Sequence, residues 1–277
     1  METNIILAGV GGQGILAISF VIDMTAINHG LSFKQAEVHG MSQRGGAVSS
    51  HLRVSDGLIH SDLIPKGQAT LILAVEPLES LRYVEYLSPK GAVVTSIDPF
   101  VNIDNYGDLD ALLGVIATIP EHIMLPADRL ARQAGTAKAQ NMVMLGAATA
   151  YLNLPQQGLE TSIEAAFDRK GERVKQVNIN ALRVGMAAGQ AYRALLAAGL
   201  DYKAACALVG RLDGGKLDKD AVEPWKDVLT GVNGQAVIEL CAGKLSGKVI
   251  ATAERAEQIN KLTNPDADTL KGTVFAK

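Results

Sequence analysis

The sequence predicts an α/β fold with three layers, in which helices cover a mixed, mostly parallel sheet and a helical C-terminal part follows. Over the first 135 residues, short apolar runs alternate with helix-like segments, which is typical of parallel strands joined by crossover helices. From residue 139 onward, alanine-rich segments with helical periodicity replace the strands. We therefore divide the chain into a domain over residues 1–198 and a helical C-terminal extension over residues 199–277.

The first strand, turn and helix form the best-defined unit. Residues 4–8 are a short apolar run, and helical periodicity over 15–28 ends at Gly30, which suits a helix C-cap. The turn between them has glycines at four positions: Gly9, Gly11, Gly12 and Gly14. Such a turn can bind a phosphate through N–H groups at the helix start. It can equally serve only to let the chain pass tightly beneath a neighbouring segment.

The second predicted strand leads into a polar loop. Residues 37–46 read Glu-Val-His-Gly-Met-Ser-Gln-Arg-Gly-Gly, between strand-like runs at 31–38 and 47–54, which is more than a plain hairpin turn needs. The candidate site residues here are Glu37, His39, Gln43, Arg44, Gly45 and Gly46. Because this loop and the glycine turn both follow parallel strands, we expect them at the same edge of the sheet, where α/β folds build sites. The alternative is a solvated surface turn.

The rest of the domain is expected to add strands and then helices. Strands are expected at 58–60, after a hairpin signal at 55–57, and at 70–75, 91–95 and 122–125. Helices are expected at 78–87, 128–133, 139–152, 159–167 and 174–198. The small residues of the last helices favour close helix packing over a ligand site.

Composition excludes several classes of protein. The net charge is −3 and no dense cluster of Lys and Arg is present, which argues against binding of nucleic acid. No apolar run approaches the ~20 residues that span a bilayer, and no signal peptide is evident. Cys206 and Cys241 are too few to hold an iron–sulfur cluster, which takes four ligands as a rule. We expect a reduced, cytoplasmic protein with no membrane segment and no metal of its own.

The chemistry of a complete catalyst is missing from the sequence. It contains no Gly-x-Ser-x-Gly elbow, no Walker A motif and no His-Glu-x-x-His. His39 has Glu37 and Arg44 nearby and is suited to acid–base work, but no nucleophile accompanies it. His51 and His60 are expected to face each other across the predicted hairpin, as a strand pair rather than as metal ligands.

Several motifs, in this order, resemble a known family. They are residues 9–15, residues 37–46, the pair Glu76-Pro77 after a strand, and residues 141–147. Together they resemble the gamma domain of the 2-oxoacid:ferredoxin oxidoreductases. The stretch His-Gly-Met-Ser-Gln within 37–46 is similar to the arylpyruvate branch, the small (beta) subunit of indolepyruvate ferredoxin oxidoreductases. The resemblance covers residues 1–198 and does not extend into residues 199–277.

The resemblance implies a subunit that is not catalytic alone. In such enzymes thiamine diphosphate with Mg attacks a 2-oxoacid, CO2 leaves, electrons pass through 4Fe–4S clusters to ferredoxin, and coenzyme A (CoA) takes the acyl group. The thiamine diphosphate, Mg and clusters would lie in a large catalytic partner subunit. Arg44 and Gln43, with His39 behind them, would lie nearest the partner's active site, since Arg can hold a carboxylate or phosphate in a bidentate way.

Two alternatives belong to other functional classes. The first is a stand-alone nucleotide-binding α/β enzyme that uses the glycine turn, with Glu37 about 20 residues on as the acid that holds a ribose. The second is an assembly or regulatory protein, which the extension over residues 199–277 keeps open. Binding of a dinucleotide by the purified chain would separate the first alternative from an oxidoreductase subunit. Co-purification with a large subunit that contains thiamine diphosphate and clusters would separate the second alternative from it.

Overall fold

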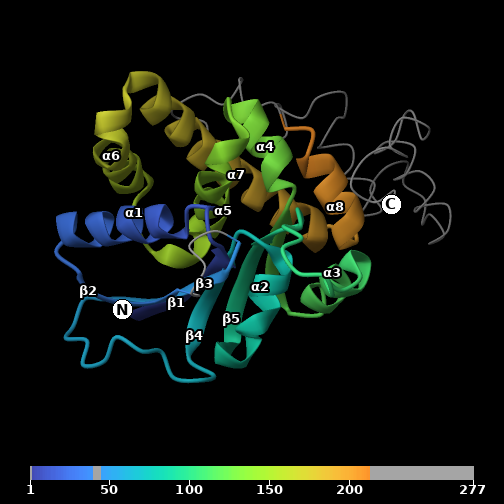
Figure 1. Ribbon diagram of the computed structural model, residues 1–277, viewed down its shortest axis with the longest axis horizontal. Helices are drawn as coiled ribbons and strands as arrows, with labels where there is room; N and C mark the ends of the chain where they lie inside the picture. Colours follow the sequence, from blue (N-terminus) through green and yellow to red (C-terminus); the bar gives the residue numbers. More distant parts are fainter. Residues whose placement is uncertain (1, 40–44, 213–277) are drawn as a thin grey trace.

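The structure, a computed structural model, describes residues 2–39 and 45–212, and within them one mixed six-stranded sheet orders the domain (Figure 1). The strand order is β2-β3-β1-β4-β5-β6. The strands are β1 (Glu2–Val10), β2 (Ser32–His39), β3 (Ala47–Ser55), β4 (Ala69–Ala74), β5 (Leu87–Ser96) and β6 (Glu121–Leu125). β1, β4, β5 and β6 pair in parallel, whereas β3 is antiparallel to both β1 and β2. The predicted mixed, mostly parallel sheet is confirmed.

Helices cover both faces of this sheet, so the three-layer arrangement is confirmed as well. The helices are α1 (Ile15–Asn28), α2 (Pro77–Arg82), α3 (Leu109–Ile116), α4 (Ala127–Ala134), α5 (Gln140–Leu152), α6 (Gln156–Phe167), α7 (Glu172–Ala197) and α8 (Tyr202–Val209). Short 3-10 turns are η1 (Val84–Tyr86), η2 (Ala137–Ala139) and η3 (Asp168–Lys170). The helices α1, α5, α6 and α7 form one layer, and α2 and α3 lie on the other side of the sheet (Figure 1).

The connection that follows β1 and the one that follows β4 lead toward opposite ends of the sheet. The step β1–α1–β2 runs toward one end of the sheet, and the step β4–α2–β5 runs toward the other. Because such crossovers are right-handed, the two helices lie on opposite faces, and the ends of β1 and β4 form the switch point at which open α/β sheets usually bind ligands. The Val75 N–H donates to the Ala8 carbonyl oxygen (3.0 Å) at this point. The glycine turn and Glu76-Pro77 thus follow the two strands that border this switch point.

The predicted return strand over residues 58–60 is wrong. The turn at 55–57 does form, with the Gly57 N–H donating to Ser55 Oγ (3.0 Å), but residues 58–60 form no strand. The physical reason is that β3 already pairs along both edges, with β1 and with β2. The polar loop instead joins β2 and β3, which pair as an antiparallel hairpin. Our expectation that residues 37–46 are not a hairpin connection is therefore wrong.

The expected pair of His51 and His60 does not form. The Ile64 N–H donates to His51 Nδ1 (3.1 Å), and the His51 ring packs edge-on against Tyr86 at 5.2 Å between centroids. His60 is exposed, in the segment without a strand. The surroundings of His51 are therefore those of a packed core residue.

The helical half is held by close contact between α5 and α7. A Cβ atom added to Gly146 would lie 2.0 Å from the Leu182 carbonyl oxygen, and one added to Gly185 would lie 1.9 Å from that of Val143. The small residues therefore let the two backbones touch, as predicted. The helix expected over 78–87 ends early, since α2 stops at Arg82 and η1 follows.

The first part of the predicted extension packs on the domain. The Cys206 thiol of α8 donates to the Met124 carbonyl oxygen of β6 (3.3 Å), and Lys203 pairs with Asp110 of α3 (3.0 Å). The remainder of the extension, residues 213–277, lies outside the described residues.

Candidate functional site

The glycine turn and the polar loop are joined directly by their backbones. The Gly11 N–H donates to the Gly46 carbonyl oxygen (2.8 Å), and the Gly45 N–H donates to that of Gly11 (3.3 Å). The pairing of β1 with β3 runs up to this point, where Val10 is opposite Ala47. The two loops therefore lie at the same edge of the sheet, as expected. β1 and β2 both end at this edge, although β3 separates them.

Two hydrogen bonds close the glycine turn on itself. Gln13 bridges it, since its side-chain Oε1 accepts from the Val10 N–H (2.8 Å) and its own N–H donates to the Val10 carbonyl oxygen (3.0 Å). Gly12 and Gly14 have φ of 103° and 79°, a region that favours glycine. With the Gly11 N–H also bound, these contacts favour the interpretation of a tight turn over that of an open phosphate loop.

Asn141, at the start of α5, locks the end of this turn. Its Nδ2 donates to the Gly14 carbonyl oxygen (3.1 Å), and a Cβ atom on Gly14 would lie 2.6 Å from the same nitrogen. The first and fourth motifs of the sequence, residues 9–15 and 141–147, are therefore in contact. Their spacing of more than a hundred residues hides this contact from any local pattern.

Glu37 lies on the edge strand, away from the glycine turn. It is exposed, pairs with Ser50 across β3, and accepts a hydrogen bond from Gln35 Nε2 (2.5 Å). In a dinucleotide-binding fold the ribose-binding acid ends the strand next to β1, whereas here β3 stands between. This geometry weighs against the alternative of a nucleotide-binding enzyme that uses Glu37.

The negative charge of Glu37 instead contributes to a raised pKa at the buried Asp23 of α1. Asp23 is buried, with 8% of its surface exposed, and its Oδ1 has no hydrogen-bond partner within the described residues. Burial, and secondarily the negative charge of Glu37, raises the pKa of Asp23 to about 7. Removing this carboxylate from water favours its neutral form.

Asn102 supports the polar loop from the segment after β5. Its Nδ2 donates to the Gly45 carbonyl oxygen (2.6 Å). The loop is thus held on two sides, by the glycine turn and by Asn102. Sequence reasoning missed Asn102, because an asparagine in an irregular segment carries no periodic signal.

Glu76 has a structural role at the switch point, after β4. It is buried, and its Oε2 caps α2 by accepting from the Glu79 N–H (2.8 Å). Its Oε1 accepts from the Tyr106 hydroxyl and from the Phe100 N–H (3.4 Å for the latter). Burial, together with the hydrogen bond to Glu76, raises the pKa of the Tyr106 phenol. The Glu76-Pro77 pair therefore fixes the loop after β5 on the start of α2.

Part of the candidate site falls outside the described residues. Gln43 and Arg44 lie there, as does the side chain of His39, whose backbone ends β2 opposite Val48. Gly45 and Gly46 are described and make the contacts above. Within the described ranges, no three His, Cys, Asp or Glu side chains gather as a metal site. A search of the same ranges found no helix with both the length and the hydropathy to cross a bilayer.

Most of the chain is similar to known proteins. Residues 4–188 match the family described as pyruvate ferredoxin/flavodoxin oxidoreductase. Indolepyruvate oxidoreductase subunit IorB of Archaeoglobus fulgidus is 36% identical over 192 residues, which are 67% of this chain and 94% of the relative. IorB of Methanothermobacter thermautotrophicus is 36% identical over 195 residues, 68% of this chain and 98% of the relative.

Solved structures share the fold. The gamma subunit of a keto/oxoacid ferredoxin oxidoreductase from Geobacter sulfurreducens has a TM-score of 0.51 and 21% identity, covering 68% of this chain and 99% of that one. A 2-oxoglutarate:ferredoxin oxidoreductase from Magnetococcus marinus, with 2-oxoglutarate, coenzyme A and succinyl-CoA bound, has a TM-score of 0.55 and 22% identity. The match covers 69% of this chain and 31% of the Magnetococcus chain.

Proposed function

The chain belongs to the pyruvate ferredoxin/flavodoxin oxidoreductase family and is a subunit of a 2-oxoacid:ferredoxin oxidoreductase, and we propose that it completes the substrate and CoA side of an active site whose cofactors lie in a partner subunit. The observation that carries the proposal is the backbone link between Gly11 and Gly46. It holds the chain directly after Arg44, at Gly45 and Gly46, against the glycine turn, at the edge of the sheet where α/β folds bind ligands.

The proposed substrate is an arylpyruvate such as indolepyruvate. Relatives named as indolepyruvate oxidoreductase subunits are 31–36% identical to this chain, whereas the 2-oxoglutarate synthase and ketoisovalerate oxidoreductase subunits are 24–30% identical. The His-Gly-Met-Ser-Gln stretch ahead of Arg44 supports the same branch. Electrons would leave to ferredoxin through the partner.

The residues of the polar loop have distinct proposed roles. Arg44 would hold the substrate carboxylate or a CoA phosphate through paired N–H donors. Gln43 would add a polar contact, with His39 behind it. Gly45 and Gly46 have no side chains to block close approach, and Asn102 fixes the position of the loop.

The cofactors are assigned to the partner because this chain's thiols do not fit a cluster. The Cys206 thiol is buried and donates to a backbone carbonyl, and burial raises its pKa. A cluster takes four Cys thiolates as a rule, and the sequence has two cysteines, Cys206 and Cys241. Thiamine diphosphate with Mg, bound in the partner, would supply the chemistry that releases CO2.

We propose that the partner docks beside the joined loops, on the outer face of α1 and the free edge of β2. Leu16, Phe20 and Ile27 are 46%, 47% and 50% exposed along α1. Phe33 and Val38 of β2 add exposed apolar surface. No strand within the described residues pairs with the outer edge of β2, and such an edge can pair with a partner. The large subunit is the occupant proposed for this surface, because it must reach the same edge of the sheet. The division of the chain at residue 198 remains our proposal for its domain boundary.

Co-expression with the large subunit tests the assembly. We expect a stable complex that carries thiamine diphosphate and iron, and a Phe20→Glu substitution on α1 should dissociate it. Val115→Glu on α3 is the matched control, since Val115 is 54% exposed on the opposite face of the sheet. A chain that never associates with the large subunit would refute the proposed function.

Arg44→Lys then tests the site within the intact complex. A ligand role predicts a KM for 2-oxoacid or CoA raised about tenfold or more, because a charge-assisted bidentate contact is lost. A role only in pinning the loop predicts lower thermal stability or lost assembly with an unchanged KM. Arg132→Lys, which alters an exposed arginine paired with Asp128 on α4, is the control. Unchanged assembly, Tm and kinetics in the Arg44 variant would exclude both roles.

A further inference from the structure

One carboxylate lies within the apolar stripe of α1 on which the partner is proposed to dock. Leu16, Phe20, Asp23 and Ile27 follow one another at intervals of four, three and four residues, so they share one face of the helix. The three apolar residues are exposed, whereas Asp23 is 8% exposed. Asp23 therefore lies beneath the surface that a docked partner would cover.

This carboxylate has no hydrogen-bond partner at Oδ1 within the described part of the chain. The hydroxyl one turn earlier on α1, Ser19 Oγ, donates to the Leu16 carbonyl oxygen (3.1 Å). On β2, the Nδ-type donors are replaced by one amide: Gln35 Nε2 donates to Glu37 Oε1 (2.5 Å) and to Ser50 Oγ (3.0 Å). Both N–H groups of that amide are thus used, and these donors on α1 and on the neighbouring strand bind other acceptors.

The described basic side chains of β2 and β3 lie on the other face of the sheet. Glu37 is on the face covered by α1, since its charge contributes to the raised pKa of the α1 carboxylate. Side chains alternate along a strand, so Lys34, three residues before Glu37, is directed to the opposite face. Arg53 lies opposite Lys34 in the register, and His51 has the same parity on β3. None of these three side chains is therefore directed toward α1.

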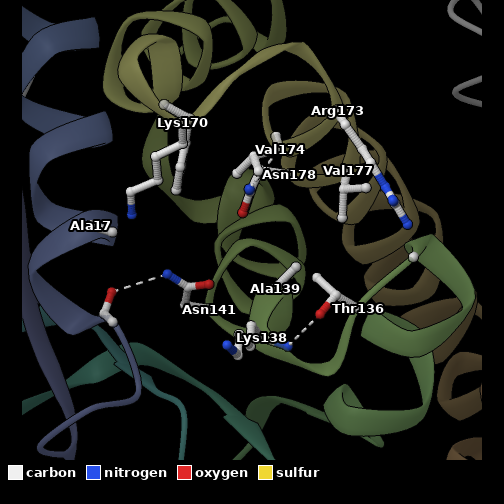
Figure 2. Close-up of a pocket in the computed structure, with 13 residues that line it drawn as sticks. Ala17, Thr136, Lys138, Ala139, Asn141, Lys170, Arg173, Val174, Val177 and Asn178 are labelled. Carbon is white, nitrogen blue, oxygen red and sulfur yellow. Dashed lines mark hydrogen bonds between the residues drawn. The ribbon is translucent and has the colours of Figure 1, made fainter.

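Three exposed cations of the helical half stand on a different side of α1. A cavity of about 650 Å³ opens where the starts of α1, α5 and α7 converge, and Lys138, Lys170 and Arg173 line it. Figure 2 shows this cavity, with Ala17 of α1 at its border. Ala17 and Asp23 are six residues apart, so they face different sides of a helix with 3.6 residues per turn. These cations are therefore not placed to meet the carboxylate.

A partner that covers the stripe would remove the remaining water from Asp23. Burial already raises the pKa of Asp23, and the charge of Glu37 adds to this effect. Burying the carboxylate further without a cation would oppose association, because its hydration is lost. A cation of the partner at the same place would offset that loss and bond directly to the carboxylate.

We infer that the large subunit places a lysine or arginine side chain against α1, where its cation pairs with the Asp23 carboxylate between Phe20 and Ile27. The two apolar side chains exclude water from the pair. The apolar stripe supplies contact area, and the charge pair fixes the position of the partner along the helix. This inference rests on the proposed large-subunit partner and adds the chemistry of one contact to it.

Subunit exchange in the assembled complex tests the charge pair. The full chain with Asp23→Asn is co-expressed with the large subunit, and its displacement by labelled wild-type chain gives the dissociation rate. We expect dissociation about tenfold faster or more, because the substitution leaves the partner's cation buried without its counter-charge. Glu164→Gln on α6 is the matched control, since it neutralises an exposed carboxylate outside the stripe, and it should leave the rate unchanged.

The direction of the change separates the possible states of Asp23 in the interface. A carboxylate buried without a cation predicts slower dissociation in Asp23→Asn, and a neutral carboxyl group predicts an unchanged rate. Either result would overturn the inference. The isolated Asp23→Asn chain should fold with a Tm no lower than that of the wild type, so faster dissociation reports on the interface rather than on the fold.

Substitutions in the large subunit identify the cation. Among its lysines and arginines, one replacement by glutamine should speed dissociation from the wild-type chain and have no further effect with Asp23→Asn. If the complex forms and no such position exists, this inference fails and the proposed function survives. If the two subunits never associate, both fail. Self-association of the isolated chain that Asp23→Asn weakens would identify a second copy of the chain as the occupant and overturn the inference.

Discussion

Glycine serves two different purposes in the α5–α7 contact and in the glycine turn. Gly146 and Gly185 have ordinary helical backbones, and what excludes a side chain is the neighbouring helix at about 2 Å. Gly12 has open space around it, and what excludes a side chain is its own φ of 103°. The first requirement comes from tertiary packing and the second from local conformation. Gly14 has both.

Gly185→Ala should have the largest effect. Its Cβ would meet the Val143 carbonyl oxygen at 1.9 Å, and a backbone atom within a packed helix cannot move aside cheaply. Overpacking costs about 1–3 kcal/mol and occasionally more, and we expect a loss of about 3 kcal/mol or more in the free energy of unfolding measured with urea. Gly114→Ala in α3 is the control, because it has open space and a helical backbone, and should gain about 0.5–1 kcal/mol. Equal effects of the two would show that α5 and α7 are not in contact.

Asp23→Asn should stabilise the protein at neutral pH. Because burial raises the folded pKa of Asp23 to about 7, the stability from its neutral form is present below the unfolded value of 3.8 and is lost as the pH rises toward 7. The variant does not titrate, so its gain should grow between pH 4 and 7 and reach about 2–4 kcal/mol at pH 8. Urea unfolding at pH 5 and pH 8 measures this gain. A gain that is independent of pH would contradict the assignment.

Gly14→Ala and Gly12→Ala together separate conformation from packing within one turn. Both residues have positive φ, which costs an L-residue about 1–2 kcal/mol. Only Gly14 adds a close contact, with Asn141 Nδ2 at 2.6 Å. We expect Gly14→Ala to lose about 1 kcal/mol more than Gly12→Ala, because the amide must shift and its hydrogen bond weakens. If Gly12→Ala is the more damaging, the contact with α5 does not hold the turn.

Asn102→Ala should have the smallest effect on global stability. It removes one hydrogen bond to the Gly45 carbonyl oxygen, worth about 1 kcal/mol. The local effect should be larger: the Gly45 amide, which donates to Gly11, should exchange its hydrogen faster with solvent. Asn105→Ala, an exposed neighbour in the same segment, is the control and should leave exchange unchanged. Unchanged exchange at Gly45 in the Asn102 variant would show that the glycine turn alone holds the loop.

The sequence by itself determined the elements whose signal is local. The apolar runs at 4–8 and 70–75 are strands, and the helix expected over 15–28 is α1 with those bounds. The ordered motifs indicated the family correctly. These features depend on periodicity, on φ restrictions and on chemistry carried within about 15 neighbouring residues, so they can be recognised without knowing what packs against them.

Only the tertiary structure decided which strands pair and which distant residues meet. The strand expected over 58–60 is absent because β3 pairs along both edges, with β1 and with β2. The sequence of residues 58–60 contains no information about that pairing. The same holds for the contact of Gly14 with Asn141 and for the cavity, whose cations stand on η2, η3 and α7. Residues far apart in the chain line one cavity only because α1, α5 and α7 start at one place. Partners and available space, rather than propensity, determine that convergence.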